Sequence, residues 1–145
     1  MSGLSFGRPA TTPTGDCPCG SGTAYARCCG PLLAGERAAA TAEELMRSRY
    51  TAFATGDVDH LVRTWHPRTR PGHLTLDPAT TWTGVTVVGS ERGGVGDSDG
   101  VVEFVARFEE PSAGAGRGPV RGRLHEVSRF TRRGGRWVYV DGDQR

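Results

Sequence analysis

Residues 17–29 read CPCGSGTAYARCC and hold all four cysteines of a 145-residue chain. Cys17 and Cys19 form one close pair, and Cys28 and Cys29 form another. A disulfide within either pair would close a ring too small for relaxed geometry. Four soft thiolates in two pairs joined by a short loop instead suit tetrahedral zinc. The stretch therefore predicts a zinc site, with free structural cysteines or a redox pair as the alternatives.

The same stretch resembles the SEC-C motif, a small zinc-binding module named for the C-terminal tail of the bacterial preprotein-translocase ATPase. The resemblance rests on the pattern C-x-C-G-S-G-x-x-Y-x-x-C-C. It implies that one zinc ion binds Cys17, Cys19, Cys28 and Cys29, although the translocase typically has His where this chain has Cys29. A site with four protein ligands leaves no position for a catalytic water, so this zinc is expected to be structural.

Two helices are predicted to follow the cysteines. Thr41 and Glu44 make a T-x-x-E capping box at a helix start, and apolar residues then recur at helical spacing. Gly56 is expected to end this helix. Asp57 can cap a second helix, which ends before Pro67.

From residue 80 the sequence changes to strand patterns. Four strands are predicted, at 81–88, 101–109, 121–131 and 136–141. The last two are expected to form a hairpin around residues 133–135. The glycine-rich loops 89–100 and 110–119 are expected to be mobile. Helices followed by an antiparallel meander give an α+β fold, with the helices packed on one face of the sheet.

The order of these elements resembles the YchJ-type family, bacterial proteins with an N-terminal SEC-C motif followed by a nuclear-transport-factor-two-like domain. The matching pieces beyond the cysteines include LMRSRYTAF at 45–53 and VEFVARF at 102–108. The resemblance implies an α+β fold with an N-terminal zinc knuckle and a cone-shaped domain, in which helices pack on a curved antiparallel sheet. We accordingly expect a flexible N-terminus at 1–14, the zinc knuckle at 15–31 and the cone-shaped domain at 38–145.

Composition narrows the function classes. No stretch approaches the roughly 18 consecutive apolar residues of a membrane span, and residues 1–16 lack the apolar run of a signal peptide, so a soluble, cytoplasmic protein is expected. The 18 basic residues are all Arg and face 16 acidic ones, which gives a net charge of +2. Because the chain also has no Lys, Ile or Asn, a GC-rich genome explains the Arg content better than nucleic-acid binding does. Arg129, Arg132, Arg133 and Arg136 surround the hairpin tip and are interpreted as a solvated turn.

Domains of the cone-shaped fold often hold a pocket between sheet and helices. Alternation along 121–131 places Glu126 and Ser128 on the same face as Leu124. If that face is inward, desolvation would raise the pKa of Glu126 toward that of a general base. The favoured alternative is that Glu126 pairs with a neighbouring Arg, accepts from a backbone amide or is exposed to solvent at a bulge. Trp82 near a pocket mouth could stack on a ligand. Trp82, Glu126 and Ser128 are therefore the pocket candidates, and Glu126 is the one candidate for catalysis.

These features together predict a small cytoplasmic protein with one structural zinc ion. The leading hypothesis is a non-enzymatic adaptor that docks on another protein through its zinc knuckle. By analogy with the translocase tail, that partner would belong to the secretion-chaperone or ribosome environment. The alternative is a small-molecule-binding protein or enzyme that uses the pocket of the cone-shaped domain, and a nucleic-acid binder is the third hypothesis. No membrane partner is expected.

Overall fold

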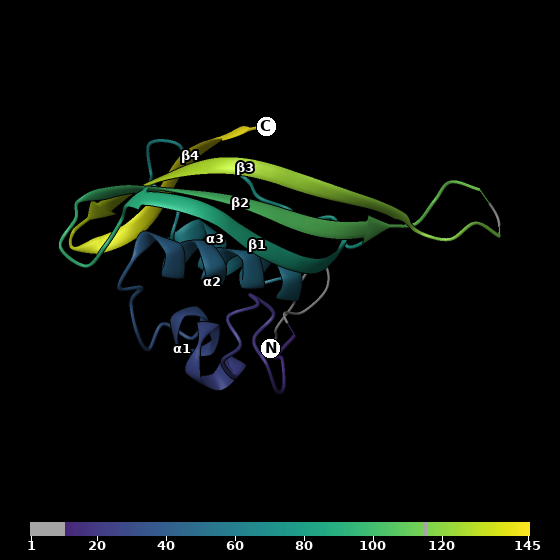
Figure 1. Ribbon diagram of the computed structural model, residues 1–145, viewed down its shortest axis with the longest axis horizontal. Coiled ribbons are helices and arrows are strands. Elements are labelled where there is room, and N and C mark those ends of the chain that lie inside the picture. Colours follow the sequence, from purple (N-terminus) through teal and green to yellow (C-terminus); the bar gives the residue numbers. More distant parts are fainter. Residues whose placement is uncertain (1–10, 115) are drawn as a thin grey trace.

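The computed structural model describes residues 11–114 and 116–145. The helical elements are the 3-10 turn η1 (Tyr25–Arg27) and the α-helices α1 (Cys29–Leu33), α2 (Ala42–Thr55) and α3 (Val58–Arg63). The strands are β1 (Thr81–Arg92), β2 (Asp99–Glu110), β3 (Val120–Arg133) and β4 (Arg136–Gln144), and they form one antiparallel sheet in the order β1-β2-β3-β4. Figure 1 shows α2 and α3 beneath the curved sheet, with α1 on the far side of α2. The predicted α+β fold is confirmed.

Helix α2 begins and ends where the sequence predicts. The Thr41 hydroxyl accepts a hydrogen bond from the Glu44 amide at 3.1 Å, and the Glu44 carboxylate in turn accepts one from the Ala40 amide at 2.7 Å. The capping box therefore satisfies two backbone donors, although the second is one residue earlier than in the usual motif. Gly56 ends the helix with a left-handed φ of 85°. Among the described residues, no helix is long and apolar enough to cross a membrane.

The strands are longer than the predicted ones. Strand β1 continues to Arg92, which pairs with Gly100 of β2, so the predicted loop 89–100 shrinks to residues 93–98. Sequence patterns missed this extension because residues 89–92 are glycine, serine and charged side chains, which pair through their backbones without an apolar face. The β3–β4 hairpin turns at Gly134 and Gly135, whose φ angles of 60° and 82° only glycine adopts freely.

A single apolar cluster joins the N-terminal cysteines to the sheet. We call residues 15–31 the cysteine knuckle and residues 38–145 the cone-shaped domain. Buried members of the cluster come from the knuckle, from α2 and from the inner face of the sheet, among them Cys17, Cys19, Cys29, Leu45, Met46, Tyr50, Val85, Val102 and Ala106. The knuckle is therefore packed into the core of the cone-shaped domain.

Of the expected flexible segment 1–14, residues 1–10 lie outside the described residues, and the Thr11 amide donates to the Thr55 carbonyl at 2.9 Å.

His60 lies buried between α2 and α3 in a chain of hydrogen bonds. Arg63 donates to His60 Nδ1 at 3.1 Å, so Nε2 carries the proton and donates to the Ser48 hydroxyl at 2.9 Å. Ser48 donates to the Leu45 carbonyl at 2.8 Å. Burial, reinforced by the charges of Arg63 and Arg49, lowers the pKa of His60 to about 3. The imidazole is therefore neutral at physiological pH.

This buried imidazole makes stability depend on pH. The unfolded chain binds a proton at His60 below a pH of about 6.5, whereas the folded chain does not until about pH 3. The contribution of the neutral His60 to the free energy of unfolding is therefore fully present above pH 6.5 and is lost as the pH falls toward 3. Between pH 7.5 and 5.0 we expect this residue alone to cost about 2 kcal/mol of unfolding free energy. Urea unfolding of the native chain and of His60→Gln at both pH values measures the difference. An equal loss in both proteins would contradict a neutral His60.

Candidate metal centre and central cavity

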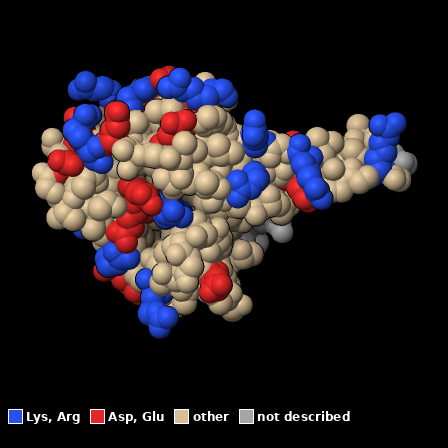
Figure 2. All heavy atoms as spheres, in the orientation of Figure 1, with Lys and Arg blue, Asp and Glu red and all other residues tan. Residues whose placement is uncertain are grey.

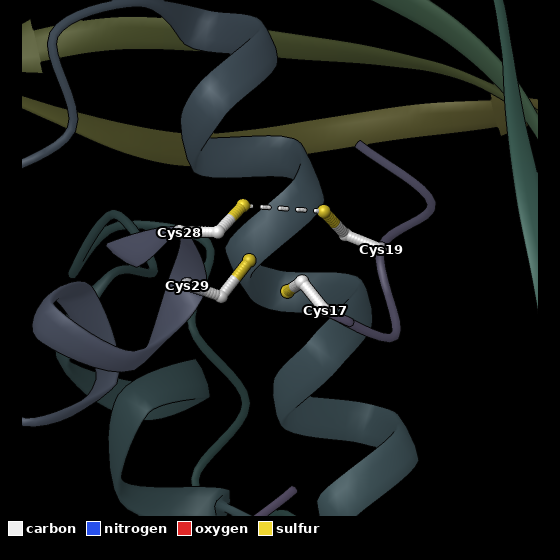
Figure 3. A group of neighbouring side chains, drawn as sticks. All are labelled: Cys17, Cys19, Cys28 and Cys29. Atoms are coloured by element: carbon white, nitrogen blue, oxygen red, sulfur yellow. Dashed lines mark hydrogen bonds between the residues drawn. The ribbon is translucent and has the colours of Figure 1, made fainter. Parts of the chain in front are cut away.

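The four cysteine sulfurs converge on one point. Their Sγ atoms all lie within 4.8 Å of one another, and Cys19 Sγ is 3.6 Å from Cys28 Sγ. Figure 3 shows Cys17 and Cys19 facing Cys28 and Cys29 across a common centre. Sulfurs at about 2.3 Å from a tetrahedral zinc ion would lie about 3.8 Å apart, which is close to the separation found here. The donor set and its spacing therefore fit a four-thiolate metal site.

The loop between the two cysteine pairs depends on glycine. Gly20 and Gly22 have φ angles of 77° and 83°, in the left-handed region that other residues rarely adopt. These turns present Ser21, whose hydroxyl lies 3.1 Å from Cys28 Sγ. A hydroxyl at this position can donate a hydrogen bond to a thiolate and orient it.

Without a cation the four thiols cannot all ionise. Hydrogen bonds from Cys17 and Cys29 lower the pKa of Cys19, and hydrogen bonds with Cys17 and Cys19 raise the pKa of Cys29. Burial raises the pKa of Cys28. One thiolate is thus stabilised at the expense of its neighbours, as expected for closely spaced like charges. A divalent cation in the centre would remove this conflict and favour the deprotonated form of all four.

Helix α2 holds the cysteine knuckle from one side. The Thr51 hydroxyl lies 3.4 Å from Cys29 Sγ and 3.8 Å from Cys17 Sγ, and Thr51 is fully buried. Arg47 donates to the Cys19 carbonyl at 2.6 Å. The sulfur cluster is therefore anchored to two side chains one helical turn apart on the same helix.

A central cavity of about 220 Å³ lies on the sheet side of α2. Seven aromatic side chains line it, namely Tyr50, Phe53, Trp65, Trp82, Phe104, Phe130 and Tyr139. Several of these rings meet edge to face, as Trp82 does with Tyr50 and with Phe108 at centroid distances of 6.2 and 5.3 Å. The cavity is thus a largely apolar space with rigid walls.

All three pocket candidates from the sequence line this cavity. Trp82 comes from β1, and Glu126 and Ser128 come from β3. Ser128 donates to Glu126 Oε1 at 2.8 Å, and Glu126 forms no ion pair among the described residues. A Cβ at Gly142 would lie 2.7 Å from Glu126 Cδ, so the absence of a side chain there makes room for the carboxylate. Instead of an ion pair with Arg, the carboxylate has a hydroxyl partner at the cavity wall.

Sequence reasoning missed Arg49, the cation of the central cavity. Arg49 is 6% exposed, and it donates to the Leu61 carbonyl at 2.9 Å and to the Thr64 hydroxyl at 2.7 Å. Its guanidinium lies 5.0 and 4.5 Å from the centroids of the Trp65 and Tyr139 rings. Burial lowers the pKa of Arg49 to about 10, so the group stays charged at neutral pH. Its position one turn after Leu45 and Met46, on the apolar face of α2, was the available signal.

The arginines around the hairpin tip have different partners. Arg129 pairs with Asp141 and Asp143 at 2.6 and 2.9 Å, and Arg132 donates to backbone carbonyls and lies over the Trp137 ring at 4.5 Å. Figure 2 shows acidic side chains next to basic ones at several places on the visible face.

Known proteins resemble this chain in both of its parts. A family model described as YchJ, middle NTF2-like domain, matches residues 41–142, and a model of the SEC-C motif matches residues 16–31. UPF0225 protein SCO1677 of Streptomyces coelicolor is 49% identical over 131 residues, which cover 90% of this chain and 97% of that protein. A UPF0225 protein of Cupriavidus metallidurans is 47% identical over 145 residues, which cover 96% of this chain and 95% of that protein.

Solved structures agree with the fold. The solution structure of RPA3114, a SEC-C motif containing protein from Rhodopseudomonas palustris, is 38% identical with a TM-score of 0.73 and covers 88% of this chain and 96% of that one. The crystal structure of a SEC-C motif containing protein from Psychrobacter arcticus is 26% identical with a TM-score of 0.66 and covers 88% of this chain and 80% of that one. With its cysteine cluster, its SEC-C motif and its NTF2-like domain, the chain belongs to the UPF0225 family of YchJ-like proteins.

Proposed function

We propose that this protein binds a small aromatic molecule in its central cavity, and that one structural zinc ion in the cysteine knuckle braces the cavity wall. The observation that carries the proposal is the position of α2. On one side, Thr51 contacts the sulfur cluster, and on the other, Arg49 and Tyr50 line the cavity. The same helix therefore serves both sites.

Zinc is the metal that this donor set favours. Four thiolates are soft ligands, and zinc takes four of them in a closed tetrahedron. The knuckle has only short helical elements, η1 and α1, and its buried side chains are mainly the cysteines themselves. Metal binding would therefore supply much of the free energy that orders this segment.

We expect the purified protein to contain about one zinc per chain, measured by inductively coupled plasma mass spectrometry on protein prepared without chelator. The change Cys28→Ser should bring the zinc content close to zero, because it removes one of the four thiolates. The control is Ser21→Ala, which removes the hydroxyl 3.1 Å from Cys28 Sγ but keeps all ligands, and it should retain the ion. Native protein with another metal, or Cys28→Ser with full zinc content, would rule out the proposed site.

The size and lining of the central cavity indicate the ligand class. Its volume of about 220 Å³ exceeds the roughly 150 Å³ of an apolar cavity that binds benzene and lies below the usual range for drug-sized ligands. One substituted ring therefore fits. Glu126, Ser128 and Arg49 give the wall a few polar groups that can orient a substituent, as in most small-molecule sites.

Single-ring probes test this cavity. We expect at least one of benzoate, phenol and benzylamine, at millimolar concentration, to shift the indole N–H signal of Trp82 in nitrogen-15 NMR spectra. The signal of Trp137, which does not line this cavity, should stay in place. The change Ala106→Leu would fill part of the cavity and abolish the shift, whereas Val88→Leu on the exposed surface would not. If no probe moves the Trp82 signal, or if Ala106→Leu binds as tightly as the native chain, the cavity is not a ligand site.

The adaptor role expected from the sequence stays a prediction. In the cysteine knuckle, residues 15, 16, 20–23, 26 and 27 are exposed, and none of these has a large apolar side chain. Hot spots of protein interfaces are usually buried aromatic or arginine anchors, of which this surface offers only Arg27. A partner from the secretion-chaperone or ribosome environment is supported by the SEC-C motif alone. Ligand binding therefore has the stronger physical support.

A further inference from the structure

A second cavity, the arginine cleft, lies where the cysteine knuckle meets the cone-shaped domain. Its volume is about 340 Å³. One wall is formed by residues 32–39, which follow the knuckle, and the opposite wall by the β3–β4 hairpin, with α3 and residues 64–70 completing the cleft. Small ligands bind preferentially in clefts between parts of a protein, and this volume lies within their usual range.

The arginine cleft is rich in positive charge. Five arginines line it, namely Arg37, Arg63, Arg70, Arg133 and Arg136. Two are paired, Arg37 with Glu44 at 2.9 Å and Arg63 with Asp59 at 3.1 Å. The side chains of the other three form no ion pair or hydrogen bond within residues 11–114 and 116–145. These three guanidinium groups come from two separate segments, the loop after α3 and the hairpin.

The net charge of the cleft residues that form no ion pair matches a ligand with two negative charges. The three unpaired guanidinium groups carry +3, and Glu36 is the one carboxylate that lines the cleft, so 3 − 1 leaves +2. A phosphate monoester carries about −1.5 to −2 at neutral pH and presents three acceptor oxygens. The planar fork of a guanidinium group donates two parallel hydrogen bonds to such oxygens, which makes Arg the preferred residue for phosphate. A singly charged carboxylate would leave part of this charge uncompensated.

Trp65, one of the residues that line the cleft, has an unused hydrogen-bond donor. Trp65 Nε1 is buried and has no hydrogen-bond partner among the described residues. Trp65 lines the arginine cleft as well as the central cavity. Buried donors without an acceptor are rare in folded proteins, and they often mark a place where a ligand or an ordered water completes the bonding. Trp137, whose Nε1 donates to the Ala40 carbonyl at 3.2 Å, lies on the same cleft.

We propose that the arginine cleft binds a small organic phosphate monoester. Arg70, Arg133 and Arg136 hold the phosphate, while residues 35–39 and the two tryptophans Trp65 and Trp137 enclose the organic part. Trp65 is the one lining residue that this site shares with the central cavity, and the proposal does not depend on the aromatic ligand proposed there. A ligand that contacts both the segment after the knuckle and the hairpin would also join the two parts of the chain.

Titration of the zinc-containing full chain with glycerol phosphate tests this site, because this probe has no ring for the central cavity. Uncharged glycerol is the control for the organic part. In 150 mM chloride we expect the phosphate to shift the indole signal of Trp137 and to leave that of Trp82 in place, and glycerol to shift neither. Absence of a Trp137 shift at millimolar glycerol phosphate would overturn the proposal, whatever the result with aromatic probes.

Two matched triple variants distinguish a specific phosphate site from general electrostatic attraction to a positively charged protein. The variant Arg70→Gln/Arg133→Gln/Arg136→Gln should weaken glycerol phosphate binding at least about tenfold, because each charge-assisted hydrogen bond to phosphate contributes substantially to affinity. The control Arg117→Gln/Arg121→Gln/Arg123→Gln removes the same charge from exposed positions near the β2–β3 turn and should bind like the native chain. Equal weakening in both variants would overturn the proposal.

The variants are expected to fold, since all three cleft arginines are exposed and unpaired. An unchanged thermal midpoint and zinc content would establish this.

A single-stranded RNA oligonucleotide serves as a further probe. If RNA displaced glycerol phosphate and bound with a steep dependence on salt that both triple variants reduced, the cleft would be part of a nucleic-acid surface and the small-ligand proposal would be wrong.

Discussion

The contact between Thr51 and the cysteine sulfurs is the constraint on which the rest of the structure depends. Thr51 lies in the C-terminal half of α2 and is fully buried, with its hydroxyl within 3.8 Å of two of the four sulfurs. Because a helix is stiff over its 14 residues, fixing this face of α2 also fixes the opposite face. A metal bound by the cysteines would therefore act on the sheet side of the helix as well as on its own loop.

The buried charge of Arg49, on the sheet side of α2, depends on the rigidity of this helix. Arg49 remains cationic although it is almost fully buried, and it is held by two hydrogen bonds and two aromatic rings. A buried charge is stable only where its partners are fixed in place, and a small rotation of α2 would separate Arg49 from them. Packing of the knuckle against α2 thus supports the polar wall of the central cavity. The arginine cleft depends on the same packing, since residues 32–39 continue directly from the knuckle.

Local features of the sequence were predictable, and long-range contacts were not. The cysteine motif, the Thr41 cap, the Gly56 stop and the glycine turn of the last hairpin each follow from residues adjacent in the chain. Alternation along β3 also indicated that Glu126 shares a face with apolar residues. By contrast, Arg49 contacts Tyr139, which lies near the far end of the chain, and the arginine cleft brings residues 32–39 together with the tip of the β3–β4 hairpin. Such pairs leave no periodic signal, because only the folded topology brings them together. The packing of the knuckle into the core was missed for the same reason.

Hydrogen exchange of the native protein before and after treatment with a zinc chelator tests the proposed link between the knuckle and the cavity most directly. The proposed bracing role of zinc predicts that chelation lowers amide protection in α2, residues 42–55, together with the knuckle, residues 15–31, while the sheet stays protected. Loss of protection confined to residues 15–31, with α2 unchanged, would contradict it.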